Sequence, residues 1–236
     1  MILKNGIRMN YEWLIFDADG TLFDYTMAEH QALQNSFEYF ACEFHPEYIS
    51  LYHRFNKKLW DDFELGKTTI PFLKTERFRL LLQELNIPVS PALFSDRYLY
   101  YLSQGTQLIN GADRLLEAIE GKAGMILMTN GIKEVQRSRL QLSPIGRHFS
   151  DIIISDEVGA AKPDKKIFEI AMTRLPVTDK KKVLMIGDNL SSDIKGGVDF
   201  GMPTCWYNPQ ALSGDPDIRP DHEIRRLEEL LPIVGL

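Results

Sequence analysis

Short apolar runs of strand length recur along the second half of this chain, and one more stands near its start. The first is Trp13–Phe16, and the others lie near residues 124–128, 152–154, 183–186 and 203–206. Between them, apolar residues recur at helical spacing, as in Leu115, Leu116 and Ile119. This alternation predicts an α/β fold, with a Rossmann-like parallel sheet and helices on both of its faces.

The stretch from about residue 26 to residue 102 has a different pattern. It has almost no β-branched runs, and its apolar residues recur at helical spacing, as in Phe37, Phe40, Ala41 and Phe44, and again in Phe78, Leu81, Leu82 and Leu85. Prolines at 46, 71, 88 and 91 are placed to begin or follow helices. We therefore predict a core of residues 1–24 and 104–236, with a helical domain of residues 25–103 inserted after the first strand.

The two ends of the chain carry weaker patterns. Residues 1–10 contain charged and polar residues and no apolar stretch of about 7–15 residues, which predicts a short disordered leader rather than a secretory signal. Pro209–Pro220 is rich in proline, glycine and aspartate and is predicted to be a surface loop. A last helix is predicted over Glu223–Leu231.

Composition narrows the class of protein. The chain has 236 residues, of which 44% are hydrophobic and 25% charged, as in ordinary globular proteins. Its net charge of −6 disfavours nucleic-acid binding, and no apolar run approaches the length of about 20 residues that a membrane helix needs. Cys42 and Cys205 are too few for a disulfide framework, which favours a reducing, cytoplasmic setting.

Two carboxylates directly follow the first predicted strand. The segment 17–21 reads Asp-Ala-Asp-Gly-Thr, and Gly20 allows a tight turn there. Ligands of open α/β sheets bind at the carboxyl ends of the strands, and buried acids are costly unless a metal or a reaction uses them. Asp17 is therefore a candidate nucleophile, and Asp19 is a candidate acid or base.

Three later segments place further polar groups at strand ends or next to a helix start. Thr129, Asn130 and Gly131 follow one apolar run, and Gly187 and Asp188 end another, with Asp193 five residues on. Lys162 precedes Pro163 and Asp164, which suit the start of a helix. Taken singly, these residues are ordinary caps, turns and surface charges. Their combination and order indicate a site for phosphoryl transfer.

In this order, Asp-x-Asp-Gly-Thr, Thr-Asn-Gly, Lys-Pro and Gly-Asp-x-x-x-x-Asp, the chain resembles the haloacid dehalogenase-like hydrolase superfamily. The resemblance implies that Asp17 attacks phosphorus to form an aspartyl-phosphate and that Asp19 is the general acid and base. It implies a Mg²⁺ ion bound by the Asp17 carboxylate, the Asp19 carbonyl and Asp188. Thr129, Asn130 and Lys162 would hold the phosphoryl group, and Asp193 would orient a metal-bound water or Lys162.

The resemblance also indicates which reaction of the superfamily to expect. Phosphatases of the superfamily carry an acid two residues after the nucleophile, and Asp19 fills that place, so dehalogenation is not expected. Transport ATPases with these motifs need membrane spans that the sequence lacks. An insertion directly after the first motif corresponds to the superfamily's first type of helical cap, and the alternative is a purely structural helical appendage.

The predicted helical cap contains candidate substrate contacts. Trp60 and Phe63 precede Gly66, which is placed to end a helix, and their rings could stack on a nucleobase or simply pack within the cap. The chain resembles the pyrimidine 5′-nucleotidase branch in several cap and core segments: Phe16–Asp19, Asn56-Lys57-x-Leu59-Trp60, Gly66, Arg77-Phe78, Val158–Pro163 and Thr204-Cys205-Trp206-x-Asn208. It departs from that branch at Phe23–Tyr25 and at Gly20, where relatives often have glutamate.

We therefore expect a Mg²⁺-dependent phosphomonoesterase that acts on a nucleoside monophosphate. The alternatives are a phosphatase for sugar phosphates or phosphoglycolate, a phosphomutase, and an interaction protein that has lost catalysis. The sequence leaves the oligomeric state and the physiological substrate open.

Overall fold

Residues 9–236 are described by a computed structural model, and they divide into two compact units. The core unit combines the chain up to Asp24 with Gln107–Lys133 and Leu140–Leu236, and the helical unit combines Tyr25–Thr106 with Glu134–Arg139. The leader predicted for residues 1–10 falls almost entirely outside the described residues. Within the described range, every helix is too short or too polar to cross a membrane.

A six-stranded sheet forms the centre of the core unit, and its strand order is β3-β2-β1-β4-β5-β6. All neighbouring strands pair in parallel, as the alternating pattern predicted. The predicted strands are confirmed to within one residue at each end. The strands are β1 (Trp13–Phe16), β2 (Gly124–Thr129), β3 (Asp151–Ile154), β4 (Val183–Gly187), β5 (Thr204–Tyr207) and β6 (His222–Ile224).

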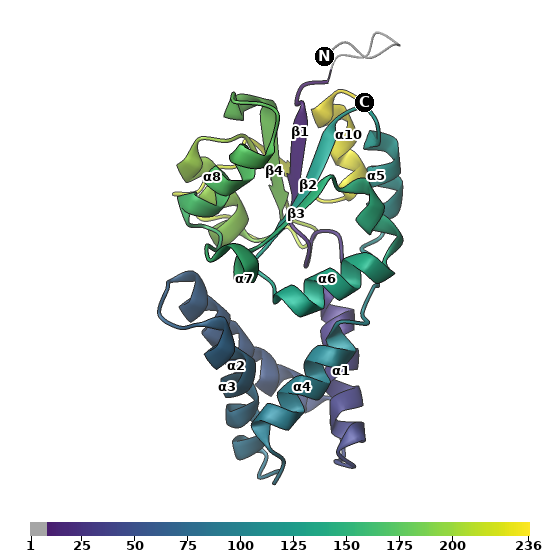
Figure 1. The fold of residues 1–236 in the computed structure, drawn as a ribbon, viewed down its shortest axis with the longest axis vertical. Helices are drawn as coiled ribbons and strands as arrows, with labels where there is room; N and C mark the ends of the chain where they lie inside the picture. Colours follow the sequence, from purple (N-terminus) through teal and green to yellow (C-terminus); the bar gives the residue numbers. More distant parts are fainter. Residues whose placement is uncertain (1–8) are drawn as a thin grey trace. The chain divides into compact units, whose positions relative to one another are not determined.

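Helices cover both faces of this sheet (Figure 1). Successive side chains of a strand point to opposite faces, so Phe16 belongs to one apolar core and Ile15 to the other. The helices α5 (Ala112–Ile119) and α10 (Leu230–Val234) pack on the first core, and α8 (Lys165–Arg174) packs on the second. The α/β fold class predicted from the sequence is therefore confirmed.

The remaining helical segments of the core unit are short. They are α7 (Ser155–Val158), α9 (Lys195–Phe200) and single turns at Pro144–His148, Lys180–Lys182, Leu190–Ile194 and Leu227–Glu229. The helix α6 (Lys133–Leu142) contributes residues to both units.

One sequence prediction about the core unit is wrong. The helix predicted over Glu223–Leu231 is instead divided among β6, the turn at Leu227–Glu229 and α10. The strand β6 has three residues and lies at the sheet edge, where it pairs with β5 from Cys205↔His222 onward. So short a strand shows no periodicity of its own and is defined by its neighbour.

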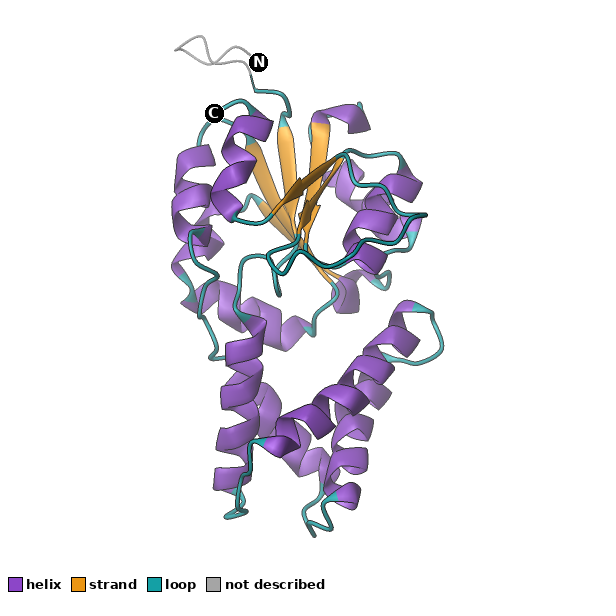
Figure 2. Ribbon diagram, turned by 180° about the vertical axis from the view of Figure 1, so that it is seen from behind, coloured by secondary structure: helices purple, strands orange, loops and turns teal. Residues whose placement is uncertain are grey.

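The helical unit contains no strand among its described residues, as Figure 2 shows by colour. Its helices are α1 (Tyr25–Tyr39), α2 (Glu47–Glu64), α3 (Ile70–Glu84) and α4 (Pro91–Leu102). Prolines stand in the first turn of α3 and of α4, where the missing N–H costs no hydrogen bond. Gly66, in the left-handed conformation with φ of +68°, follows the end of α2 as predicted.

Aromatic side chains fill the interior of the helical unit. The ring of Phe78 lies 5.2 Å from that of Phe94 and 4.9 Å from that of Tyr98, measured between centroids. The guanidinium of Arg77 is buried against the rings of Phe78 and Tyr98. It donates a hydrogen bond to Asn56, which donates in turn to Glu29. A buried charge is tolerable when it is hydrogen-bonded in this way, so this chain links α3, α2 and α1.

Candidate active site

The candidate catalytic residues meet at the carboxyl edge of the sheet. Asp17 directly follows β1, Thr129 ends β2, and Asp188 directly follows β4. Strand β1 lies between β2 and β4, and Phe16 is in register with Leu127 on one side and Ile186 on the other. Parallel pairing in this register brings the three strand ends together, as the sequence predicted for a sheet of this class.

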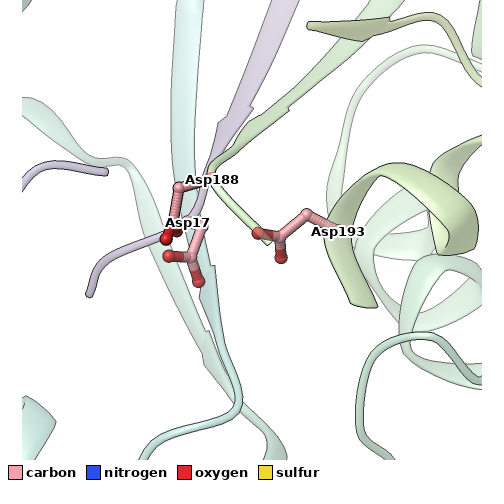
Figure 3. Close-up of side chains that lie close together, drawn as sticks. All are labelled: Asp17, Asp188 and Asp193. Carbon is pink, nitrogen blue, oxygen red and sulfur yellow. The ribbon is translucent and has the colours of Figure 1, made fainter. Parts of the chain in front are cut away.

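Three aspartates form a compact cluster at this edge. Carboxylate oxygens of Asp17, Asp188 and Asp193 all lie within 4.8 Å of one another. Figure 3 shows the three side chains converging, with Asp193 arriving from the helical turn Leu190–Ile194. Asp17 and Asp193 are only 6% and 1% exposed. So much negative charge in a buried place requires positive partners.

Lys162 supplies one of these partners. Its Nζ lies 2.5 Å from Asp17 Oδ1 and 2.7 Å from Asp193 Oδ1, and it donates to the carbonyl of Met128 at 2.9 Å. The residue is 1% exposed, so it is not the solvated surface charge that an isolated lysine usually is. Asp193 therefore contacts Lys162 directly, which is one of the two orienting roles expected for it.

The ionisation of the cluster reflects burial and crowding. Burial raises the pKa of Asp17 well above its ordinary value, and the attraction of Lys162 only partly offsets this. Burial and repulsion from Asp193 raise the pKa of Asp188 to about 7. Burial acts to lower the pKa of Lys162, but the Asp17 and Asp193 carboxylates outweigh it and raise that pKa. The lysine thus stays charged, but its single positive charge does not fully balance the buried carboxylates of Asp17 and Asp188.

The donor set fits a hard divalent cation. Asp17 and Asp188 offer carboxylate oxygens to the same small volume, and one lysine does not balance three acids. Magnesium ions in proteins prefer such oxygen ligands, completed by water. An added cation would relieve the same repulsion that raises the pKa of Asp188.

Two neighbouring segments hold Asp188 in place. The Thr21 hydroxyl donates to Asp188 Oδ1 at 3.1 Å, and the indole Nε1 of Trp206 donates to the Asp188 backbone carbonyl at 2.9 Å. Gly20 has φ of +85°, and a Cβ added there would lie 2.4 Å from Asp188 Oδ2. This turn therefore leaves no room for a side chain at position 20 while Asp188 keeps this place.

Asp19 lies in the turn that follows β1. The carbonyl of Ala18 accepts from both Leu22 and Phe23, and Gly20 donates to the carbonyl of Phe23 at 3.0 Å. These bonds close the turn tightly after the buried Asp17. Asp19 is partly exposed, unlike the buried Asp17.

Thr129 and Asn130 connect the β2 end to Lys162. Asn130 accepts from the Lys162 backbone N–H and donates to its carbonyl, both at 2.8 Å. The Thr129 hydroxyl oxygen accepts from Gly131 at 3.0 Å, which leaves its hydrogen for another acceptor. Asn130 thus engages the lysine segment with both atoms of its amide.

Sequence reasoning did not assign functional roles to Thr21 and Trp206. Thr21 lies inside the first motif, and its spacing alone does not reveal the contact with Asp188, 167 residues away. In the sequence, Trp206 stands out only as part of the segment Thr204-Cys205-Trp206-x-Asn208, in which the chain resembles the pyrimidine 5′-nucleotidase branch. Its role depends on the pairing of β4 with β5, where Gly187 is in register with Trp206, and no local pattern encodes that register.

Trp60 and Phe63 lie in the last turns of α2, within the helical unit. Their rings meet edge to face, with centroids 5.7 Å apart, and both residues are partly exposed. They stand outside the fully buried aromatic interior around Phe78. The two rings pack against each other, and because both residues are partly exposed, part of the ring surface remains available to a ligand.

Comparison with known proteins agrees with this geometry. A profile described as haloacid dehalogenase-like hydrolase matches residues 11–201. The HAD-hydrolase YfnB of Bacillus subtilis is 37% identical over 96% of this chain and 96% of its own length. A crystal structure of YfnB bound to magnesium has a TM-score of 0.91 and covers 96% of this chain and 100% of that one.

Two further relatives carry a named activity. The pyrimidine 5′-nucleotidase YjjG of Escherichia coli is 36% identical over 94% of this chain and 97% of its own length. The pyrimidine 5′-nucleotidase PynA of Streptococcus pneumoniae is 34% identical over 94% of each chain. The chain is therefore similar over nearly its whole length to proteins of one family.

Proposed function

Because the chain belongs to the haloacid dehalogenase-like hydrolase family, we propose that it is a phosphomonoesterase that works through an aspartyl-phosphate on Asp17. Family membership confirms the resemblance drawn from the four motifs. The observation that carries the proposal is the position of Asp17, buried at the carboxyl end of β1 with Lys162 Nζ 2.5 Å from its Oδ1. A carboxylate held there by a single cation is oriented for attack.

The reaction runs in two displacements. In the first, a carboxylate oxygen of Asp17 attacks phosphorus, the bond from phosphorus to the ester oxygen breaks, and Asp19 gives its proton to the leaving oxygen. In the second, Asp19 takes a proton from water, the water oxygen attacks phosphorus, and the bond to Asp17 breaks to release phosphate. The partial exposure of Asp19 suits this exchange of protons with substrate and water.

Lys162 and Thr129 stabilise the charge on the transferring group. When Asp17 is esterified it loses its negative charge, and Lys162 remains fixed by Asp193 and by the carbonyl of Met128. Its ammonium is then available to the phosphoryl oxygens. The free hydrogen of the Thr129 hydroxyl can donate to the same group. Asn130 supports this arrangement because both of its amide atoms bond to the Lys162 backbone.

A Mg²⁺ ion would be held by the carboxylates of Asp17 and Asp188 and by the Asp19 backbone carbonyl. When bound, such an ion neutralises charge on the phosphate ester and orients it for in-line displacement. The compact oxygen cluster supports this assignment.

The substrate that fits best is a pyrimidine nucleoside 5′-monophosphate. YjjG and PynA, both named pyrimidine 5′-nucleotidases, match this chain over nearly its full length. The partly exposed rings of Trp60 and Phe63 offer a surface on which a base can stack.

The test is hydrolysis of a panel of phosphate esters: pyrimidine and purine nucleoside monophosphates, sugar phosphates, phosphoglycolate and p-nitrophenyl phosphate. We expect the highest kcat/KM with pyrimidine nucleotides, complete loss after EDTA, recovery with Mg²⁺ and inhibition by Ca²⁺, whose looser coordination misplaces Asp17. A sugar phosphate or phosphoglycolate preferred by about tenfold or more in kcat/KM would replace the nucleotidase assignment. Isomerised rather than hydrolysed sugar phosphate would indicate a phosphomutase, and undiminished hydrolysis after thorough chelation would refute the metal site.

A further inference from the structure

We propose that Trp206 is a positioning residue for the metal site, because its indole N–H fixes the backbone of Asp188 and so aims the Asp188 carboxylate at Asp17. The inference rests on the proposed function in one respect, that Asp188 binds a divalent cation. Trp206 itself touches neither substrate nor metal in this proposal, and it acts through Asp188.

The sheet register places the indole where the strand ladder stops. Trp206 is the third residue of β5 and is in register with Gly187, the last residue of β4. The chain leaves the sheet immediately after Gly187, so the next carbonyl, that of Asp188, lies beyond the paired strands. Trp206 Nε1 donates to this carbonyl at 2.9 Å. A side chain of β5 therefore contacts the chain one residue beyond the last paired residue of β4.

Asp188 is therefore fixed at both ends. Trp206 holds its backbone carbonyl, and the Thr21 hydroxyl holds its side chain through Oδ1 at 3.1 Å. The other oxygen, Oδ2, faces the space left by Gly20. This restraint opposes the repulsion that Asp188 experiences from Asp193. With one anchor removed, the backbone after β4 could rotate the carboxylate away from Asp17.

The indole is itself held in place. Trp206 is 4% exposed, and a Cβ added at Gly214 would lie 3.6 Å from its Cζ3, so the loop after β5 passes beside the ring. Asn208 fastens that loop, because it accepts from the Leu212 N–H at 2.9 Å and donates to the Leu212 carbonyl at 3.0 Å. A hydrogen bond in a buried site is electrostatically stronger than the same bond in water. The contact with the Asp188 carbonyl therefore restrains the indole and its partner effectively.

Many buried tryptophans only fill space, and the variant Trp206→Phe separates the two roles, because phenylalanine keeps most of the ring and removes the N–H. The matched control is Trp13→Phe, at the first residue of β1, where the ring packs against Gly124 away from the carboxyl edge. Mg²⁺ affinity is measured by calorimetry and by the rise in Tm with Mg²⁺ concentration, so the readout does not depend on activity.

We expect Trp206→Phe to weaken Mg²⁺ binding roughly tenfold, as loss of groups that orient metal ligands commonly does. The control Trp13→Phe should leave Mg²⁺ affinity unchanged. Equal Mg²⁺ affinity in wild type and Trp206→Phe would overturn the inference and leave the proposed function intact. A wild type that binds no Mg²⁺ would overturn the metal site and this inference together.

The wild-type protein provides a second measurement if Trp206→Phe does not fold. The chain has 3 tryptophans, so indole-labelled protein gives three N–H signals in a nitrogen–proton NMR spectrum. They can be assigned with Trp13→Phe and Trp60→Phe. The Trp206 signal should shift on Mg²⁺ titration with the dissociation constant found by calorimetry, while the Trp13 signal stays in place. A Trp206 signal that does not respond to Mg²⁺ would contradict the inference.

Discussion

At the scale of single residues, the site depends on Lys162 as a shared counter-ion. Its ammonium contacts Asp17 and Asp193 at once, and all three groups are buried. Pairing offsets the cost of burying these charges, and removing one partner of a buried pair leaves an uncompensated charge. In the proposed reaction, the contact with Asp193 also keeps the ammonium in place for the phosphoryl group.

Lys162→Met should abolish turnover and destabilise the metal-free protein. Methionine keeps most of the length of the side chain and removes its charge, so Asp17 and Asp193 are then buried together without the lysine cation. Breaking a buried pair costs about 3–5 kcal/mol, so the free energy of unfolding in EDTA should fall by that order. Urea unfolding at neutral pH measures it, with the exposed Lys165→Met as control. A loss no larger than that of Lys165→Met would show that Lys162 does not stabilise the cluster.

Asp17→Asn should abolish phosphatase activity and preserve the fold. An amide cannot carry the covalent phosphoryl group, yet it matches the shape of the carboxylate it replaces. Circular dichroism and Tm should remain close to the wild type. Substantial turnover, once mass spectrometry has excluded deamidation back to aspartate, would remove Asp17 from the role of nucleophile.

The sequence indicated the positions of the proposed reacting groups better than those of the groups around them. Asp17 and Asp188 could be identified because each directly follows a buried apolar run. Asp193 and Lys162 were expected near each other, and the ion pair of 2.7 Å agrees with that. Trp206 could not be given a role, since its partner carbonyl is reached only through the register of β4 with β5.

At the scale of elements, continuous apolar runs were predicted well, and the edge strand that has no such run was missed. The strands that form the centre of the sheet are continuous apolar runs. Such runs can be recognised in the sequence without knowing which elements pack against them. The edge strand β6 has three residues and was mistaken for part of a helix, because His222–Ile224 becomes a strand only by pairing with β5. Tertiary pairing, rather than local preference, decides such segments.

A pH-dependent contact links two helices of the helical unit. His53 Nε2 on α2 lies 2.5 Å from Glu29 Oε2 on α1, and this hydrogen bond raises the pKa of His53 above its ordinary value. The stabilisation is therefore fully present below the unfolded-state pKa of about 6.5 and is lost as pH rises through the raised pKa of the folded state. Because the imidazole is half exposed, the effect should stay below about 1 kcal/mol.

His53→Gln tests this contact. The Tm of the wild type should exceed that of the variant most at about pH 6, and the difference should shrink as the solution becomes alkaline. His30→Gln, at an exposed position of α1, serves as the control for replacing a histidine in this unit. A wild-type advantage that grows with pH would contradict the assigned direction of the pKa shift.

At the scale of the whole molecule, chemistry and selection of substrate are assigned to different units. The proposed reacting groups belong to the core unit, and the aromatic residues proposed to select the base belong to the helical unit. The pattern of the sequence predicted the sheet and the inserted helices because each has its own period. It could not predict the preferred ester, since Trp60 and Phe63 have the same spacing whether they pack or bind.

Selection of the base can be tested by removing these rings. If Trp60 and Phe63 contact a nucleobase, replacing either with alanine should raise KM for pyrimidine nucleoside monophosphates. Base stacking on aromatic side chains contributes about 1–3 kcal/mol, so kcat/KM should fall roughly tenfold to a hundredfold. Turnover of p-nitrophenyl phosphate should change far less, because Asp17, Thr129 and Lys162 are untouched.

A packing role gives a different pattern, which makes the measurement decisive. If the two rings only pack against each other, their loss should lower Tm and reduce kcat/KM equally for every substrate. Phe72→Ala is the matched control, because Phe72 lies on α3 of the same unit and its ring is 54% exposed. Its variant should affect neither Tm nor preference. Equal losses on nucleotides and p-nitrophenyl phosphate would return Trp60 and Phe63 to a structural role and favour a phosphatase for smaller esters over a nucleotidase.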